Sequence, residues 1–293
     1  MLVLSLLLAC SAASPAAAPR VIAVGDVHGD ATALREVLQL AEVIDADGQW
    51  IGGDAVVVQV GDQLDRGDGE REVLDLLHRL RADAAQAGGA VVPLLGNHEV
   101  MTARGDWRYV TPGALAPFAP LAEGVEDPEL ERVKPEARGR YVAFKPGGPY
   151  AKRLATQPVI HIAQGTVFAH GGVLPAHVSY GVDRINTEAA AWLDGSGPFP
   201  EVLDGPDAPV WTRLYGGEAD AKTCETLTHV LGALKAQRMV VAHTVQKGGV
   251  SEACDGRLWR VDVGLAAHYG GARQALQLQG DAATVLKGRP PAR

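Results

Sequence analysis

The sequence predicts an α/β protein in which buried strands alternate with amphipathic helices around a largely parallel sheet. Short runs rich in valine and isoleucine recur along the chain, and the early ones are each followed by a glycine-containing loop and a helical pattern. The 293 residues are 47% hydrophobic, which is enough for a substantial core. We expect one main domain over residues 20–286.

Three strand-and-loop units are expected in the first hundred residues, in the segments RVIAVGDVHGD, AVVVQVGDQLDRGD and AVVPLLGNHEVM. The helix expected over residues 31–44 places Leu34 and Leu38 on one face, which is the spacing of an amphipathic helix. A second helix is expected over residues 71–89, where the pattern stops at Gly88. This order is typical of βαβ units.

The second half of the chain begins after a stretch of different composition. Residues 102–158 are rich in proline, glycine and charge with weak periodicity, so we expect an insertion or cap beside the core. Five later strands are expected in PVIHIA, TVFAHGG, RMVVAHTV, RLWRVDVG and QALQLQ. Residues 287–293 form an expected frayed tail.

The N-terminal segment, residues 1–19, has the layout of a secretory signal, an apolar run followed by small residues. Leu7, Leu8, Ala9 and Cys10 resemble a bacterial lipobox, although no Lys or Arg precedes the run. A lipidated Cys10, ordinary signal cleavage and a frayed cytosolic end all stay open. The first predicts a periplasmic or outer-membrane lipoprotein of a bacterium, and the second a secreted protein.

The net charge of −8 argues against electrostatic binding of nucleic acid or of an anionic membrane surface. Contact with a membrane is therefore expected only through an N-terminal lipid. Besides Cys10, the chain contains Cys224 and Cys254, which an oxidising compartment would allow to pair. A disulfide and two free thiols remain equal alternatives.

Polar side chains follow five of the apolar runs, where strands are expected to end. They are Asp26 and His28, then Asp62, Asp65 and Arg66, then Asn97 and His98, and finally His170 and His243. Because the carboxyl ends of parallel strands converge on one crevice, these residues can meet in space. Any single motif is more often a surface turn, but their combination predicts a metal site. Carboxylate, amide and imidazole ligands suit Mn, Fe or Zn.

The motifs GDVHG, GDQLDRG, GNHE and HGG together resemble those of the calcineurin-like metallophosphoesterases. The DRG and HGG elements are similar to the phosphoprotein phosphatase branch, and the longer segments GNHEVMTARGDWRYVTP and AHGGVLP resemble the bacterial Shewanella-like phosphatases. The resemblance implies a central β-sandwich of mixed sheets flanked by helices, with an inserted cap. It also implies two bound divalent metal ions.

The resemblance implies a role for each motif residue. Asp26 and His28 would hold one metal, Asn97, His170 and His243 the other, and Asp62 would bridge the two. His98 would protonate the leaving alcohol with its ring oriented by Asp65. The substrate phosphate would be bound by Arg66, Arg213, Asn97 and Tyr269. Among the remaining histidines, His161 and His78 are expected to be packed or solvated rather than ligands, and no ligand-like context surrounds His177, His229 and His268.

These roles predict a metal-dependent hydrolase of phosphoric esters. The expected substrate is a phosphorylated protein, with phosphotyrosine favoured over phosphoserine. The alternative keeps the catalyst but acts on periplasmic nucleotides or small phosphoesters. A third hypothesis is an inactive, lipid-anchored binding protein, and the complete set of motifs argues against it. Leu95 replaces an arginine that is typical of eukaryotic members, and no segment resembles a subunit-docking surface, so we expect a self-contained enzyme without a regulatory subunit.

Overall fold

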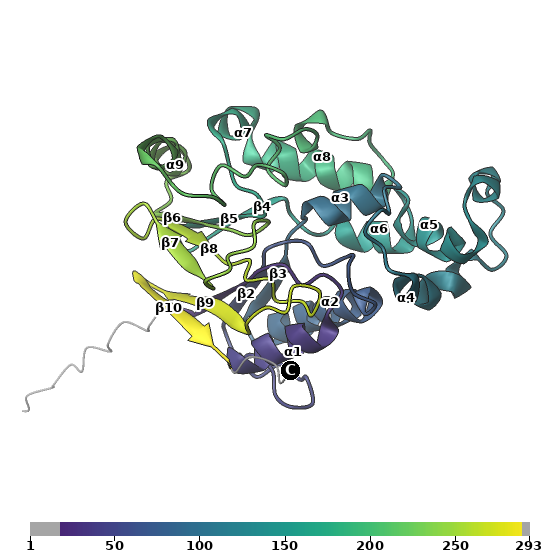
Figure 1. The fold of residues 1–293 in the computed structure, drawn as a ribbon, viewed down its shortest axis with the longest axis horizontal. Helices are drawn as coiled ribbons and strands as arrows, with labels where there is room; N and C mark the ends of the chain where they lie inside the picture. The colour runs from purple at the N-terminus through teal and green to yellow at the C-terminus, as the bar shows by residue number, and fades with distance from the viewer. Residues whose placement is uncertain (1–17, 289–293) are drawn as a thin grey trace, which may run out of the picture.

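The computed structural model describes residues 18–288 and contains two stacked sheets with helices on both outer sides (Figure 1). The residues that resemble a lipobox, Leu7 to Cys10, and residues 289–293 of the predicted tail lie outside the described residues. Between residues 18 and 288, no helix is long and apolar enough to cross a membrane.

The first sheet has five strands in the order β10-β9-β1-β2-β3. The strands are β1 (Val21–Val24), β2 (Val56–Gln59), β3 (Ala90–Pro93), β9 (Gln274–Gln279) and β10 (Ala282–Lys287). The first three strands pair in parallel, with Val21 opposite Val56 and Val58 opposite Val92, whereas β9 runs antiparallel to β1. The C-terminal hairpin therefore forms one edge of the sheet, and β3 forms the other.

The second sheet also has five strands, in the order β4-β5-β6-β8-β7. The strands are β4 (Ile160–Ala163), β5 (Thr166–Ala169), β6 (Arg238–Val241), β7 (Ser251–Ala253) and β8 (Leu258–Arg260). The central strands β5, β6 and β8 are parallel, and the edge strands β4 and β7 are antiparallel to them. Both sheets are mixed, as the family resemblance implies.

Alternation of side chains along the strands produces three apolar layers. On β1, Ile22 and Val24 face the helices α1 (Ala31–Leu40) and α2 (Glu70–Gln86), while Val21 and Ala23 face the second sheet. The interior between the sheets is completed by residues such as Phe168, Val240 and Leu276. The strand ends of both sheets are thereby held close to one another.

The remaining helices lie over the outer face of the second sheet or extend beside it (Figure 1). They are α3 (Asn97–Ala103), α4 (Pro112–Leu115), α5 (Arg138–Phe144), α6 (Pro149–Leu154), α7 (Pro175–Tyr180), α8 (Val182–Asp194) and α9 (Ala221–Leu234), with the 3-10 helices η1 (Ala116–Ala122), η2 (Pro128–Arg132), η3 (Pro135–Ala137) and η4 (Glu201–Leu203). The segment predicted as a cap, residues 102–158, contains α4 to α6 and η1 to η3. Its own core is an aromatic cluster of Phe118, Phe144 and Tyr150 with ring centroids 5.1 to 5.6 Å apart.

All eight strands expected from the sequence are present, and the mixed sheets flanked by helices that the resemblance implies are confirmed. The strand pattern alone predicts a largely parallel sheet, whereas the structure has two sheets that each combine parallel and antiparallel strands. The edge strands β7 and β10 and the helices α7 to α9 were not expected. The helix expected over residues 31–44 ends at Leu40, because Glu42 adopts a left-handed backbone (φ 54°) that turns the chain into a bridge between Ile44 and Trp50. The apolar Val43 and Ile44 are buried in this turn and not on a helix.

A disulfide joins Cys224 of α9 to Cys254 in the turn between β7 and β8, with a Cα–Cα distance of 5.3 Å. The structure therefore supports the paired alternative for these two cysteines. The bond ties an outer helix to an edge of the second sheet.

Candidate active site

Loops at the carboxyl ends of five strands bring the site residues together between the two sheets. Strands β1, β2 and β3 lead to Asp26 and His28, to Asp62, and to Asn97, while β5 and β6 lead to His170 and His243. All of these side chains are buried. The convergence expected from parallel strands is therefore present, and it draws on both sheets instead of one.

Several residues of these loops have a left-handed backbone, which is unfavourable for residues with a side chain. They are His28, Asp62, Asp65, Arg66 and His243, with φ between 46° and 68°. Each such residue costs about 1 to 2 kcal/mol. Strain of this kind is typical of functional sites, where the surrounding contacts maintain it.

Glu99 supplies much of that support through its buried carboxylate. It accepts hydrogen bonds from the backbone N–H groups of Asp62, Gln63, Leu64 and Gly96 at 2.7 to 3.2 Å. A side chain at Gly96 would clash, because its Cβ would lie 2.2 Å from the Asp62 carboxylate. The GNHE sequence therefore holds the loop after β2 against the loop after β3 through the hydrogen bonds of Glu99.

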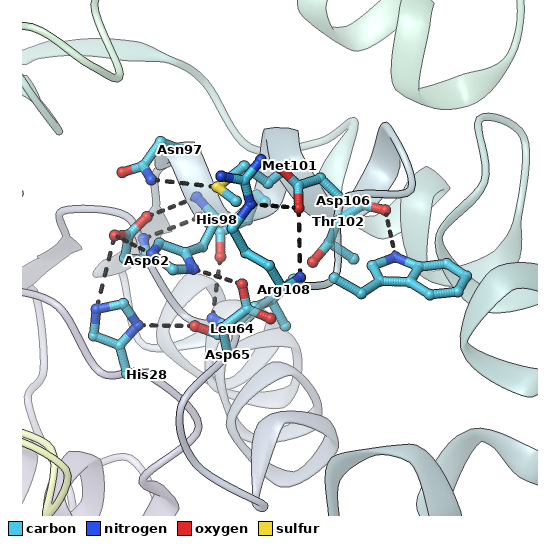
Figure 2. Close-up of polar contacts among 12 residues, drawn as sticks. His28, Asp62, Leu64, Asp65, Asn97, His98, Met101, Thr102, Asp106 and Arg108 are labelled. Atoms are coloured by element: carbon cyan, nitrogen blue, oxygen red, sulfur yellow. Dashed lines mark hydrogen bonds and ion pairs between the residues drawn. The ribbon is translucent and has the colours of Figure 1, made fainter. Parts of the chain in front are cut away.

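The histidine rings are oriented by backbone carbonyls. His28 Nδ1 donates to the carbonyl of Leu64 at 2.9 Å, and His170 Nδ1 donates to the carbonyl of Val60 at 2.8 Å. Both rings then present Nε2 to the centre of the site, at 3.8 and 3.2 Å from Asp62 Oδ2. This use of one ring nitrogen to orient the other is characteristic of metal-binding histidines. Figure 2 shows Asp62 between the imidazoles of His28 and His98.

Two groups of ligand atoms share Asp62. Atoms of His28, Asp62 and His98 lie within 4.8 Å of one another, and so do atoms of Asp62, His170 and His243. Asn97 Oδ1 lies 3.0 Å from His170 Nε2, and Asp26 Oδ2 lies 3.8 Å from His28 Nε2. The donor set therefore fits two adjacent cations with the Asp62 carboxylate between them.

The protonation states also fit divalent cations. Burial lowers the pKa of His28 to about 4 and, together with the charge of His170, lowers the pKa of His243 to about 3, so both rings are neutral at pH 7. Neutral imidazole is the form that binds metal. Burial and the neighbouring charges of Asp262 and Asp62 raise the pKa of Asp26. Carboxylates crowded in this way are stabilised by a cation.

Three buried atoms at the site have no hydrogen-bond partner among residues 18–288, namely His243 Nε2, Asp262 Oδ2 and Arg66 Nε. A buried polar atom without a partner is costly. A metal ligand sphere would satisfy the His243 nitrogen. The residues present therefore fit a pair of divalent metal ions.

His98 lies beside this centre and pairs with Asp65. The distance from His98 Nδ1 to Asp65 Oδ2 is 2.5 Å, while His98 Nε2 faces Asp62 Oδ2 at 3.8 Å (Figure 2). Burial lowers the pKa of His98, but the charge of Asp62 and the hydrogen bond to Asp65 outweigh it, so the pKa lies above its ordinary value. The ring can therefore carry a proton that Asp65 supports from behind.

Arg66 is half-buried between two tyrosine rings at the mouth of the site. Its guanidinium carbon lies 4.5 Å from the ring centroid of Tyr109 and 5.4 Å from that of Tyr269. The residues Tyr109 and Tyr269 are 39% and 38% exposed. Tyr109 also approaches His98, with ring centroids 5.2 Å apart, and Tyr269 approaches His28 at 5.6 Å. A cavity of about 320 Å³ is lined by His28, Arg66 and neighbouring loop residues.

Arg213 is exposed and lies beside the loop of His243. Its Nη1 donates to the His243 carbonyl at 3.2 Å and to Thr244 Oγ1 at 3.1 Å. The neighbouring Trp211 contacts the ring of His243 and borders a second cavity of about 500 Å³. His161 and His78 belong to neither of the two ligand groups.

Several site residues were not found from the sequence. Asp262 follows β8 just as Asp26 follows β1, so its position at the end of an apolar run was a usable signal. Glu99 stands inside a motif that was recognised, but its contacts with backbone N–H groups are visible only in the fold. Tyr109 lies in the segment of weak periodicity, where no pattern marks it.

Comparison with protein families matches residues 19–246 to the calcineurin-like phosphoesterase family. The chain is 34% identical to Shewanella-like protein phosphatase 2 of Arabidopsis thaliana, over 84% of this chain and 71% of that protein. Its fold is similar to the cold-active protein-tyrosine phosphatase of a psychrophilic Shewanella species, with a TM-score of 0.73 and 26% identity over 92% of this chain and 81% of that one. A protein serine/threonine phosphatase from Saccharomyces cerevisiae shares the fold at 15% identity, with a TM-score of 0.59 over 94% of this chain and 82% of that one.

Proposed function

Because the chain belongs to the calcineurin-like phosphoesterase family, and within it to the Shewanella-like protein phosphatases, we propose that it dephosphorylates proteins, with phosphotyrosine as the preferred substrate. It is a metal-dependent hydrolase of phosphoric esters. The observation that carries the proposal is the pairing of two metal-ligand groups on Asp62 with the His98–Asp65 pair and Arg66 at one site.

The residues divide the work of hydrolysis between them. Asp26, His28 and Asp62 would hold one metal, and Asp62, Asn97, His170 and His243 the other. Such a metal pair lowers the pKa of bound water and neutralises charge on the phosphoryl group. Arg66, with its Nε unpaired and its guanidinium at the mouth, would bind the phosphate by two parallel hydrogen bonds. Arg213 would contact the phosphate from the side of His243.

His98 would donate the proton that the departing oxygen needs. Its Nδ1 is engaged by Asp65, so only Nε2 is free to face a substrate. The hydrogen bond to Asp65 fixes the ring and supports its positive charge before the transfer. His98 also belongs to the first group of ligand atoms, with His28 and Asp62. The metal content of the His98→Asn variant distinguishes the two roles, because loss of an acid leaves both metals bound and loss of a ligand does not.

The aromatic mouth favours an aryl phosphate. A phosphate bound by Arg66, with its ester oxygen directed to His98, leaves the substituent next to Tyr109 and Tyr269. Stacked aromatic pairs contribute about 0.5 to 1.5 kcal/mol beyond area burial. The structural relative from Shewanella is a protein-tyrosine phosphatase, which supports the same preference.

Kinetic comparison of a phosphotyrosine peptide, a phosphoserine peptide of the same sequence and a mononucleotide tests this proposal. With Mn²⁺ bound, we expect the highest kcat/KM for the phosphotyrosine peptide, by about tenfold or more. A higher kcat/KM for the nucleotide would contradict the proposal and indicate a small phosphoester as the substrate. Absence of turnover on all three substrates would favour the hypothesis of an inactive binding protein.

We also propose that the chain acts in an oxidising compartment outside the cytoplasm. The Cys224–Cys254 disulfide supports this location, because such bonds persist in oxidising surroundings. The signal-like segment ending near Cys10 supports it independently. Mass spectrometry of the N-terminus of protein from its own host, with Cys10→Ser as the control, tests lipidation. A mature protein that retains Met1 would contradict the proposal.

A further inference from the structure

Arg140 is a fully buried arginine that none of the roles above uses. It lies on α5, in the segment predicted as a cap, and its side chain is 0% exposed. Burial of a charge is expensive unless partners with good geometry surround it. Its partners therefore indicate what the residue does.

The guanidinium reaches from α5 into the loop that carries Asp65. Nη1 donates to Glu70 Oε2, while Nη2 donates to Asp65 Oδ1 at 3.3 Å and to Thr102 Oγ1 at 3.1 Å. The guanidinium carbon also lies 5.0 Å from the ring of Phe144. Arg140 is thus held on the aromatic core of its own segment while its charge pairs with the catalytic loop.

The two oxygens of Asp65 have different partners. Oδ2 accepts from His98 Nδ1 at 2.5 Å, and Oδ1 accepts from Arg140. The backbone N–H of Asp65 donates to Glu70 Oε1 at 2.7 Å, which stabilises its left-handed backbone. Arg140 and Glu70 therefore fix Asp65 at its carboxylate and at its backbone, and Glu70 is itself paired with Arg140.

We propose that Arg140 is a positioning residue for the hydrolysis. By fixing the plane of the Asp65 carboxylate, it sets the direction in which His98 presents Nε2 to the leaving oxygen. The proposal rests on the phosphatase function proposed above. Catalytic groups must be held closely to be effective, and partners behind them commonly supply that constraint. Through Arg140, the segment 102–158 then helps to position the Asp65–His98 pair that donates the proton.

Leaving-group dependence separates positioning of an acid from support of the fold. p-Nitrophenyl phosphate releases an oxygen that needs little protonation, whereas phenyl phosphate releases one that needs more. We expect Arg140→Gln to lower kcat on phenyl phosphate by about 10- to 100-fold, a fraction of the full effect of an acid. The loss on p-nitrophenyl phosphate should be several-fold smaller, with KM nearly unchanged. Asp65→Asn should show the same pattern.

Arg138→Gln is the matched control, because Arg138 lies on the same helix and donates to the Val133 carbonyl, away from Asp65. It should leave both substrates unaffected. If Arg140→Gln does not fold, the losses of kcat on the two substrates are compared in Arg140→Lys and Thr102→Val, which both keep the buried positive charge. Equal loss on both substrates in these variants would overturn the proposal and leave Arg140 a structural residue.

A measurement without turnover keeps the inference separate from the phosphatase function. The proton on His98 Nδ1 in the wild type should give a low-field NMR signal that exchanges slowly, because the bond to Asp65 is short and buried. Arg140→Gln should broaden this signal or speed its exchange. An unchanged signal in Arg140→Gln would overturn the positioning role, even if the wild-type enzyme is an active phosphatase. If Arg140→Gln alters the signal but the wild type does not hydrolyse phosphate esters, only the proposed phosphatase function is refuted.

Discussion

Replacing His98 by asparagine separates the two roles that its position allows. The ring is held by Asp65 at 2.5 Å, yet its Nε2 also belongs to the ligand group with His28 and Asp62. Asparagine removes the titratable nitrogen but keeps a polar side chain. If His98 is the acid, the variant loses proton donation and keeps both metals.

The magnitude follows from the chemistry of a positioned acid. General acid catalysis contributes roughly 10²- to 10⁴-fold, so we expect kcat on a phosphotyrosine peptide to fall at least about 10²-fold. This corresponds to about 2.7 kcal/mol of transition-state stabilisation. Because Asp65 keeps its contact with Arg140, its buried carboxylate retains a partner and the variant should still fold.

The assay combines steady-state kinetics with elemental analysis of the same preparation. If His98 is the acid, we expect a low kcat with two metal ions per chain. Full activity would remove His98 from the mechanism. Loss of one metal per chain would instead make His98 a ligand, and the acid would have to be sought elsewhere.

Four further predictions follow from other parts of the structure. Asp62→Asn should weaken binding of both metals by at least about 10- to 100-fold, measured by titration with Mn²⁺, because both ligand groups share this carboxylate. Tyr109→Leu should lower the preference for phosphotyrosine over phosphoserine peptide by about 2- to 12-fold, and an unchanged ratio would exclude stacking. Cys224→Ser should reduce the free energy of unfolding in urea by about 3.6 kcal/mol for a separation of 30 residues; no loss relative to Thr228→Ser would show that the bond does not form. Because the pKa of His98 is raised above its ordinary value and the acid form is active, kcat on an alkyl phosphate should fall as the pH rises through that pKa; an identical profile in His98→Asn would contradict this assignment.

The sequence predicted the strands and the ligand loops well, for a physical reason. Buried parallel strands are short runs of valine and isoleucine, and the loops after them need glycine and polar ligands, so both signals are local. Asp26, Asp62 and Asn97 could each be located by this pattern. The number of sheets could not be predicted in this way, because β4 and β7 are edge strands whose pairing partners are set by the packing of the two layers.

The supporting residues were harder to predict because their signals are not local. Arg140 meets Asp65 across 75 residues, and nothing in its neighbourhood distinguishes it from the exposed Arg132. Glu99 acts on backbone groups, which any sequence provides. The backbone carbonyl of Tyr109 accepts a hydrogen bond from the N–H of Arg66, and its ring lies at the mouth of the site. Only the folded segment creates these contacts.

Anomalous diffraction from crystals loaded with Mn²⁺ tests the central claim most directly. Two peaks about 3.5 to 4 Å apart, one on each side of the Asp62 carboxylate, are predicted. A single peak, or peaks remote from Asp62 and His170, would contradict the assignment of a two-metal centre.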